Sequence, residues 1–341
     1  MKHIVKWGII GLGNIAFEFA KSFYNSDNAD LIALASLSDK KLIQFNEKFN
    51  IRKENLYNSY QKLLENEDID IVYIALPNAF HFEWILKVIE KNKNILVEKP
   101  AFVSLKEAEM IFNNENFKDI FFGEGYMYRY HPQINETIEI IKSGIIGKPI
   151  SMESNFGMNL VNKKNFFGFK KKIDKKKRIF NKDMGGGVIL DQGGYTTSMS
   201  LLVASLIDNL DVNNFKLTDI QTDYLNSEID IHSVAKINFD NKFTSDVTVS
   251  FRDDIEKKTV ILCENGKIIL DNSWNSEKPK MEVIGKINKT FDFKNTKNIY
   301  SLEIENISKN IIENKTEASF PGIDKKEILL NTKLINNWIN E

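Results

Sequence analysis

The chain has 341 residues, and its 46 lysine and arginine residues nearly balance its 47 aspartate and glutamate residues. A net charge of −1 argues against a general nucleic-acid-binding surface, which carries a large excess of positive charge. The single cysteine, Cys263, excludes a disulfide framework and indicates a reducing compartment. Because no apolar run approaches the ~20 residues of a membrane span, we expect a cytoplasmic protein with no membrane or nucleic-acid partner.

The first part of the chain alternates continuous apolar runs with helical patterns, and we expect it to form one domain over residues 1–123. Strands are predicted at residues 4–10, 31–37, 71–76, 95–97 and 119–122. Helices are predicted at residues 15–24, 41–49, 81–92 and 104–112, the last opened by a capping box. Buried strands joined by helices of this length predict an α/β fold with a doubly wound parallel (Rossmann) sheet.

The rest of the chain, residues 124–341, changes to longer segments of alternating polarity. These segments lie at residues 150–159, 218–225, 231–239, 243–251, 259–264 and 267–271, with helices expected at 132–143, 195–207, 300–314 and 324–339. Asn265 and Gly266 form a strong hairpin signal between the last two segments. The pattern predicts an α+β domain with a mainly antiparallel sheet, one face of which is exposed or forms an interface.

The sequence GLGNIA at residues 11–16 stands between the first strand and the first helix. Glycines in that position let backbone N–H groups approach a pyrophosphate, and the helix N-terminus favours its negative charge. We therefore predict a dinucleotide-binding turn; the alternative is a tight turn without a ligand.

The end of the second strand bears on the choice of cofactor. NAD-specific sites usually carry an acidic residue there, which accepts a hydrogen bond from the ribose 2′-hydroxyl. This chain has Ser36, and Ser38 and Lys40 follow, so these groups can receive a 2′-phosphate instead. Asp39 lies close and no arginine occupies the turn. The sequence thus favours NADP(H) and leaves NAD(H) open.

Two further motifs carry residues suited to catalysis. Glu98-Lys99-Pro100 follows an apolar strand, and a lysine at the carboxyl end of a parallel strand points into the ligand crevice. Further on, the segment GGGVILDQGGY at residues 185–195 places Asp191 and Tyr195 four residues apart, the spacing of one helical face. We expect Lys99 to meet both across the crevice. Its ammonium would favour the phenolate of Tyr195, which could then exchange a proton with a substrate.

These motifs together resemble the Gfo/Idh/MocA oxidoreductase family over essentially the whole chain. The sequence LPNAFH at residues 76–81 is similar to the family's loop on the nicotinamide side, and YMYRYHP at residues 126–132 to its domain-junction motif. Tyr195 stands where most members have histidine. Tyrosine there, and the run RIFN at residues 178–181, resemble the branch of dimeric dihydrodiol dehydrogenases, xylose dehydrogenases and glucose–fructose oxidoreductase.

The resemblance implies catalytic or substrate-binding roles for Lys99, Asp191 and Tyr195, and assembly as a homodimer or homotetramer through the sheet. Arg129 is expected to contact substrate or, alternatively, to be structural. Four histidines without paired spacing and one cysteine predict no metal site. His81 is expected beside the cofactor or as a helix cap. The predicted cofactor-binding residues are Gly11, Gly13, Asn14, Ile15, Ser36, Ser38, Lys40, Leu76, Pro77, Asn78, His81, Glu98 and Lys99.

The function predicted from the sequence is an NAD(P)-dependent oxidoreductase. It would transfer a hydride between the nicotinamide and a hydroxyl or carbonyl carbon of a sugar, sugar derivative or diol. Two alternatives are a non-catalytic dinucleotide-sensing regulator and an enzyme that uses a bound cofactor transiently. A third is a sugar-nucleotide dehydrogenase with an anionic substrate. The stretch at residues 163–178, with nine cations and one acid, suggests the third; a solvated loop is its simpler explanation.

Overall fold

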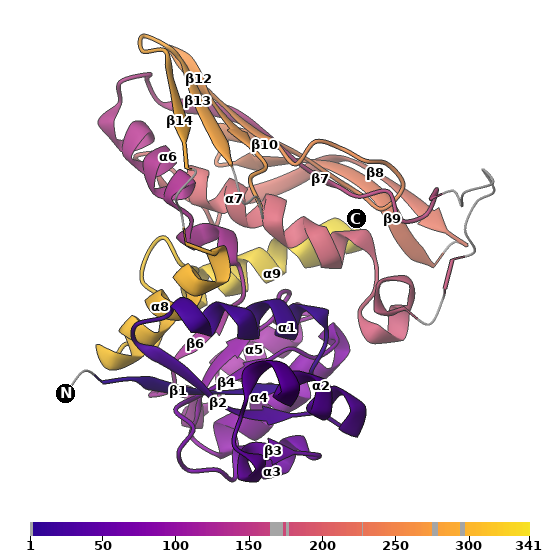
Figure 1. Ribbon diagram of the computed structural model, residues 1–341. Helices are drawn as coiled ribbons and strands as arrows, with labels where there is room; N and C mark the ends of the chain where they lie inside the picture. Colours follow the sequence, from indigo (N-terminus) through magenta and orange to yellow (C-terminus); the bar gives the residue numbers. More distant parts are fainter. Residues whose placement is uncertain (1–2, 164–172, 175–176, 227, 275–278, 294–296) are drawn as a thin grey trace. The chain divides into compact units, whose positions relative to one another are not determined.

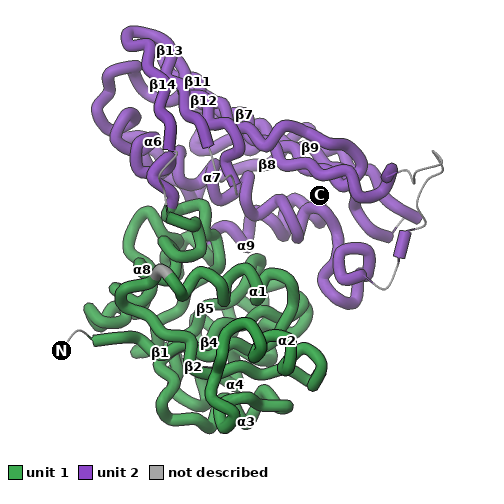
Figure 2. The backbone as a smooth tube through the Cα atoms, in the orientation of Figure 1, with its two compact units in different colours: residues 1–130, 297–329 green, residues 131–296, 330–341 purple. Residues whose placement is uncertain are grey.

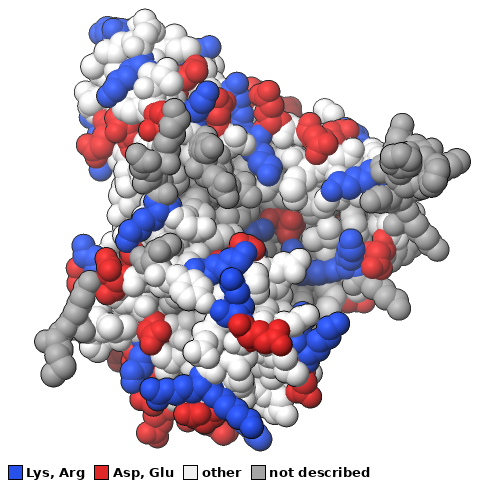
Figure 3. Space-filling view, viewed as in Figure 1, with Lys and Arg blue, Asp and Glu red and all other residues white. Residues whose placement is uncertain are grey.

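The computed structural model describes residues 3–163, 173–174, 177–226, 228–274, 279–293 and 297–341 (Figure 1). The chain divides into two compact units, residues 1–130 with 297–329 and residues 131–296 with 330–341 (Figure 2). Among the described residues, no helix has both the length and the apolar character needed to cross a bilayer. On the described part of the face in Figure 3, basic and acidic side chains are interspersed, in keeping with the small net charge.

The first unit contains a six-stranded parallel sheet in the order β3-β2-β1-β4-β5-β6. Its strands are β1 (Val5–Ile10), β2 (Ala29–Ala35), β3 (Leu56–Tyr57), β4 (Ile71–Ile74), β5 (Asn94–Val97) and β6 (Phe122–Glu124). Its helices α1–α5 are Asn14–Lys21, Asp39–Phe49, Tyr60–Leu64, His81–Glu90 and Leu105–Phe112. The predicted doubly wound parallel sheet is therefore confirmed.

Some short elements of the first unit differ from the prediction. The short elements β3 and α3 were not predicted, because a two-residue strand and a single helical turn leave no periodic signal. β6 begins at Phe122, whereas a strand was predicted over residues 119–122. Phe121 is buried in the loop before β6, which explains why this apolar stretch resembled a strand.

Helix α8 (Ile299–Ile312) packs in the core of the first unit, although the sequence analysis grouped it with the second domain. Ile304 and Ile307 belong to the same apolar cluster as Phe19 of α1 and Trp7 of β1. The indole N–H of Trp7 donates a hydrogen bond to Ser308 Oγ of α8 at 3.0 Å. Since Trp7 is fully buried, α8 supplies part of the apolar cover over the sheet.

The second unit contains an eight-stranded sheet in the order β14-β13-β12-β11-β7-β10-β9-β8. Its strands β7–β14 are Pro149–Gly157, Phe215–Leu225, Ile229–Phe239, Phe243–Ser250, Thr259–Cys263, Gly266–Asp271, Lys280–Gly285 and Lys289–Asp292. Neighbours pair antiparallel except β7 with β10, and the predicted Asn265-Gly266 hairpin joins β11 to β12. The mainly antiparallel sheet is confirmed, with β13 and β14 added at one edge.

Helices cover one face of this second sheet (Figure 1). They are α6 (Pro132–Ser143), α7 (Gly194–Ser205) and the part of α9 (Lys325–Asn340) that belongs to this unit. The indole N–H of Trp338 in α9 donates to Ser233 Oγ of β9 at 2.8 Å. Along β9 every second residue is buried, so its other side chains form the opposite, partly exposed face.

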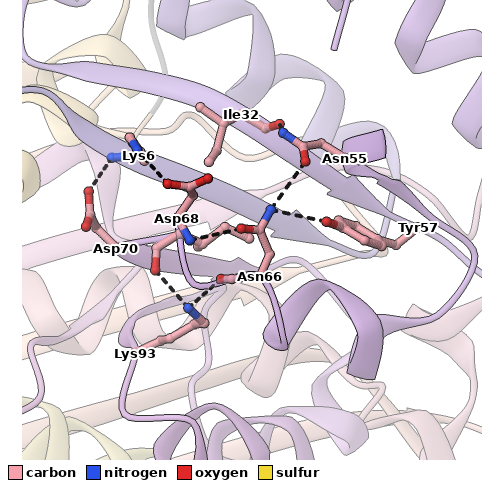
Figure 4. A network of polar contacts seen from close by, with 9 residues as sticks. Lys6, Ile32, Asn55, Tyr57, Asn66, Asp68, Asp70 and Lys93 are labelled. Atoms are coloured by element: carbon pink, nitrogen blue, oxygen red, sulfur yellow. Dashed lines mark hydrogen bonds and ion pairs between the residues drawn. The ribbon is translucent and has the colours of Figure 1, made fainter. Parts of the chain in front are cut away.

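A polar network fixes the amino-terminal edge of the first sheet (Figure 4). Lys93, just before β5, donates from Nζ to the carbonyl oxygens of Asn66 at 2.7 Å and Ile69 at 3.0 Å. Lys6 of β1 donates from Nζ to Asp68 at 2.9 Å and from its backbone N–H to Asp70 at 2.8 Å. These bonds attach the loop before β4 to its neighbours at the edge opposite the ligand-binding edge.

Replacing Lys93 tests how much this network contributes to the free energy of unfolding. Lys93→Met keeps an apolar stem of similar length but leaves two carbonyl groups without their donor. We expect the free energy of unfolding in urea at pH 7 to fall by about 1–3 kcal/mol. Lys91→Met, at an exposed position two residues away, is the matched control and should change stability by less than about 0.5 kcal/mol. Equal losses in both variants would contradict a structural role for the Lys93 ammonium.

Candidate active site

The glycine turn between β1 and α1 has the shape of an anion cradle. Gly11 has φ of +88°, and a Cβ there would lie 2.5 Å from the Ala75 carbonyl oxygen, so only glycine fits. A Cβ on Gly13 would meet nothing within 4 Å, so this side of the turn is open. Gly13 caps α1 without a side-chain hydrogen bond, which leaves the first N–H groups of the helix, from Asn14 and Ile15, to a ligand. This geometry fits a pyrophosphate.

The end of β2 brings Ser36 and Ser38 together. Ser36 is buried, and its Oγ accepts a hydrogen bond from the Ser38 N–H at 3.2 Å, so the hydroxyl proton can be donated elsewhere. Ser38 is also the N-cap of α2, and Lys40 is exposed in the first turn of that helix. A helix N-terminus, a hydroxyl donor and an ammonium group together suit a phosphate.

An apolar pocket of about 410 Å³ opens beside these residues. Leu37, whose exposed fraction is 74%, forms one wall, and Tyr60 and Trp84 form another with their rings perpendicular at 5.0 Å. A mostly apolar pocket lined by aromatic rings, next to a phosphate site, fits an adenine ring. Leu76 and Pro77 were predicted from the sequence; Tyr60 and Trp84 were not, because Trp84 meets Tyr60 only through the unpredicted helix α3. The residues that line the pocket are Leu37, Ser59, Tyr60, Leu76, Pro77, Phe80, Glu83 and Trp84.

His81 links the two predicted cofactor loops. Its ring nitrogens lie 2.8 Å from the carbonyl oxygens of Leu76 and Pro100, and the side chain is fully buried. Because a carbonyl oxygen only accepts, both contacts are hydrogen bonds only when both ring nitrogens carry hydrogen. His81 therefore ties the loop after β4, which contains Asn78, to the segment that carries Lys99.

Two carboxyl groups, those of the half-buried Glu98 and the buried Glu124, bind the backbone on both sides of Lys99. Glu98 accepts hydrogen bonds from the Tyr73 hydroxyl and, at 3.2 Å, from the Lys99 N–H. Glu124, at the end of β6, accepts the Ala101 N–H at 2.7 Å. Burial raises the pKa of Glu124 to about 8, and the negative charges of Glu327 and Glu98 add to this effect. At neutral pH Glu124 is thus largely protonated, and this state depends on burial that is not visible in the sequence.

Arg129 is fully buried within the first unit. Its Nη2 forms an ion pair with Glu327 near the start of α9. This contact favours the structural alternative for Arg129, and its substrate contact stays a prediction.

The second unit holds Asp191 and Tyr195 at the start of α7. Residues 189–193 form a π-helical turn, so the helical segment begins earlier than the predicted residue 195. Single π turns are frequent at functional sites. Asp191 Oδ1 accepts a hydrogen bond from Arg178 Nη2 at 2.6 Å, an ion pair that the sequence analysis did not identify.

The glycines before this turn make room for a capping carboxylate. Asp230 Oδ2 of β9 accepts the Ile189 N–H at 2.7 Å at the start of the turn. A Cβ on Gly187 would lie 2.1 Å from the other oxygen of Asp230, and Gly187 has φ of +113°, so only glycine fits. The Asp230 carboxylate thereby fixes the turn that carries Asp191.

Two aromatic side chains that the sequence analysis missed pack against the buried ring of Tyr195. Phe156 of β7 meets it edge to face at 5.3 Å, and Trp274 lies at 5.7 Å. The Trp274 indole N–H donates to the Asn155 carbonyl at 2.9 Å. Phe156 is visible in the sequence only as one of 24 phenylalanines.

The predicted site residues thus fall into two groups. The cofactor residues, Lys99 and Arg129 belong to the first unit, and Asp191 and Tyr195 to the second. That Lys99 meets the latter pair stays a prediction. Most of the lysine-rich stretch, residues 164–172 and 175–176, lies outside the described residues. Within the described ranges, no group of three or more His, Cys, Asp and Glu side chains could hold a metal ion.

Two family models match this chain. Residues 5–126 match the oxidoreductase family with an NAD-binding Rossmann fold, and residues 134–269 match the GFO/IDH/MocA C-terminal domain. The chain belongs to the Gfo/Idh/MocA oxidoreductase family. The resemblance recognised from the glycine turn, Lys99 and the later glycine-rich segment is confirmed.

Curated relatives include two enzyme types that were named in the sequence resemblance, a xylose dehydrogenase and a dihydrodiol dehydrogenase. A D-xylose 1-dehydrogenase (NADP(+)) of Haloferax volcanii is 25% identical over 72% of this chain and 69% of its own. A trans-1,2-dihydrobenzene-1,2-diol dehydrogenase of Xenopus tropicalis is 26% identical over 58% and 56%. A dTDP-3,4-didehydro-2,6-dideoxy-alpha-D-glucose 3-reductase of Actinomadura kijaniata is 28% identical over 56% and 53%. The alignments thus span between 53% and 69% of these three relatives.

Solved structures of Gfo/Idh/MocA-like fold cover nearly the whole chain. An aldose-aldose oxidoreductase from Caulobacter crescentus, complexed with glycerol, has a TM-score of 0.84 at 19% identity and covers 99% of this chain and 97% of its own. A 3-ketoreductase from Actinomadura kijaniata, in complex with NADP and TDP-benzene, has a TM-score of 0.82 at 18% identity, with 98% and 96% covered. At these identities the likeness shows the fold.

The protonated Glu124 predicts how stability depends on pH. Its pKa rises from 4.5 to about 8 on folding, so between these values the folded state holds a proton that the unfolded state has released. The stabilisation is complete below pH 4.5 and is lost as the pH rises through about 8, at up to about 1.4 kcal/mol per pH unit. We expect the melting temperature of the wild type to fall more steeply from pH 5 to 8 than that of Glu124→Gln, which is neutral throughout. Parallel curves would contradict a buried, protonated Glu124.

Proposed function

We propose that this chain is an NADP(H)-dependent oxidoreductase acting on a hydroxyl or carbonyl carbon of a sugar, a sugar derivative or a diol. The observation that carries the proposal is the position of the glycine turn and Lys99 at the carboxyl edge of one parallel sheet, where such folds bind ligands. The names of the xylose dehydrogenase, diol dehydrogenase and aldose oxidoreductase relatives support this substrate class.

The first unit would hold the dinucleotide along its carboxyl edge. The open side of Gly13 and the start of α1 would bind the pyrophosphate, and the pocket beside Leu37 would bind the adenine ring. Ser36, Ser38 and the exposed Lys40 would contact a 2′-phosphate, which favours NADP(H) while NAD(H) remains possible. The names of the xylose dehydrogenase and of the ketoreductase complex include NADP, which supports the same choice. When bound, the nicotinamide supplies or accepts the hydride.

The chain's own residues would handle the proton. The Tyr195 hydroxyl would take the proton of a substrate hydroxyl during oxidation and return it during reduction. The Lys99 ammonium would favour the phenolate and bind the substrate oxygen. Asp191, oriented by Arg178, would bind a neighbouring hydroxyl, and the rings of Phe156 and Trp274 would exclude water from Tyr195.

We further propose a homodimer, or a tetramer of two dimers, formed through the second sheet. On the face opposite its helices, Leu262 of β11 and Ile284 of β13 are 46% and 40% exposed. In the strand register both align with Lys267 of β12, and Val260 pairs with Ile269 in a neighbouring row. This face thus carries several partly exposed apolar side chains interspersed with charged ones such as Lys267, and such a mixed face can self-associate. A cytoplasmic location remains our expectation from the single cysteine.

Removing the Tyr195 hydroxyl tests the catalytic proposal. Tyr195→Phe keeps the ring contacts but removes the proton carrier. Turnover should fall ~10²–10⁴-fold while the affinity for NADP(H) changes little. The assay screens aldoses, inositols, sugar nucleotides and diols by nicotinamide absorbance. Near-wild-type turnover in Tyr195→Phe and Lys99→Ala would contradict these roles. NADP(H) binding without turnover of any substrate would favour the regulator.

Cofactor choice can be tested at Ser36. Titration by nicotinamide fluorescence should give tighter binding of NADP(H) than of NAD(H) in the wild type. Ser36→Asp should reverse the order, because its carboxylate repels the 2′-phosphate and can accept a hydrogen bond from the 2′-hydroxyl. Ser26→Asp, outside the predicted cofactor residues, is the matched control. A wild type that binds NAD(H) more tightly would be inconsistent with our assignment.

The assembly is tested by light scattering at micromolar concentration. The wild type should have two or four times the chain mass of 39.4 kDa. Leu262→Glu places a charge where an exposed apolar side chain stands and should give a monomer with an unchanged circular dichroism spectrum. A monomeric wild type would refute the proposed interface.

A further inference from the structure

The backbone of Arg178 is fixed within the second unit, just before the glycine-rich segment. Arg178 begins a short 3₁₀ turn, and the Gly187 N–H donates to the Ile179 carbonyl of that turn at 3.1 Å. The next side chain, Phe180, is buried, and its ring meets that of Phe251 edge to face at 6.0 Å. The turn that carries Arg178 is therefore attached both to the glycine-rich segment and to the sheet.

The two terminal nitrogens of the Arg178 guanidinium have different surroundings. Nη2 donates to Asp191 Oδ1 at 2.6 Å, and the two side chains are 31% and 14% exposed. Nη1 is buried and has no acceptor within the described parts of the chain. Nearly all buried N–H groups in proteins donate to an acceptor. Nη1 is therefore suited to an oxygen atom of a ligand that binds at this ion pair.

The ion pair restricts the chemistry of that ligand group. A carboxylate or phosphoryl oxygen can accept from Nη1, but it would lie beside the negative charge of Asp191. An ammonium group suits Asp191 but has no lone pair with which to accept from Arg178. A hydroxyl group satisfies both partners, because its oxygen accepts one hydrogen bond while its O–H donates another. The Arg178–Asp191 pair therefore fits a neutral hydroxyl group best.

Resting on the proposed function, we propose that Arg178 is a specificity-determining residue that binds, together with Asp191, one hydroxyl group of the substrate. Nη1 would donate to the oxygen of this hydroxyl, and the hydroxyl would donate to the Asp191 carboxylate. Asp191 and Tyr195 stand four residues apart in one helical segment, so this hydroxyl would be on a carbon next to the one that reacts. Arg178 would thereby select vicinal diols, including sugars, over substrates with an isolated hydroxyl group.

The test measures binding of trans-1,2-cyclohexanediol and of cyclohexanol to the enzyme–NADPH complex by nicotinamide fluorescence. Because NADPH cannot oxidise an alcohol, both compounds bind without turnover, and the two hydroxyl groups of the diol are equivalent. The wild type should bind the diol more tightly than cyclohexanol by about tenfold or more, since cyclohexanol lacks the hydrogen bonds to the charged pair. In Arg178→Met this preference should fall to about twofold or less.

Arg178→Lys separates substrate binding from the orientation of Asp191. Lysine has one terminal nitrogen, which can pair with Asp191 but cannot replace the second donor of the guanidinium. This variant should therefore lose most of the preference for the diol, as Arg178→Met does. A wild-type preference in Arg178→Lys would overturn the proposal in favour of an orienting role alone. Arg252→Lys, at another ion-paired arginine of the same unit, is the matched control and should bind like the wild type.

Three further results would overturn the proposal. They are an equal diol preference in the wild type and Arg178→Met, a wild type that binds the diol no better than cyclohexanol, and a wild type that binds malonate more tightly than the diol. The last would reassign Arg178 to an anion. Any of these results, together with turnover in the substrate screen, would reject the role of Arg178 and leave the proposed function intact. An enzyme that binds no NADPH would instead refute the proposed function itself.

Discussion

The segment that carries Lys99 is held in place by side chains buried beneath and beside it. Glu98 accepts the N–H of Lys99, Glu124 accepts that of Ala101, and His81 contacts the carbonyl of Pro100. Each partner is ionisable; Glu124 and His81 are buried, and Glu98 is half-buried. The position of the proposed catalytic lysine therefore depends on Glu98, on Glu124, whose pKa burial raises to about 8, and on the contacts of the His81 ring.

The second unit fixes its functional residues by a different means. Asp230 of β9 caps the turn before α7, because its carboxylate accepts the Ile189 N–H. Gly187 has no Cβ that would collide with this carboxylate. The π turn that follows presents Asp191 to Arg178, and Tyr195 enters an aromatic environment supplied by the sheet. Thus polar contacts around a loop position Lys99 in the first unit, whereas the capped start of one helix positions Asp191 and Tyr195 in the second.

The sequence was sufficient for features that repeat or that require a particular residue. Continuous apolar strands predicted the parallel sheet, and the alternation along β9 and β10 predicted the second one. Gly11 stood out because few residues accept its backbone conformation. Features formed by residues that lie far apart in the sequence were not predicted. Glu124 and Arg178 look like ordinary surface charges in the sequence, and Tyr60 and Trp84 form a pocket only once α3 brings them together. The meeting of Lys99 with Tyr195 remains a prediction from motifs.

The packing of α8 has a consequence for how the protein is made. The core around Trp7 is completed by Ile304 and Ile307, almost three hundred positions later in the chain. During synthesis, part of an apolar face of the amino-terminal sheet therefore stays uncovered until most of the polypeptide has left the ribosome. A fragment that ends after β6 would retain every strand of the parallel sheet yet lack this cover. The core of the first unit is consequently completed only by a segment from the carboxyl-terminal part of the chain.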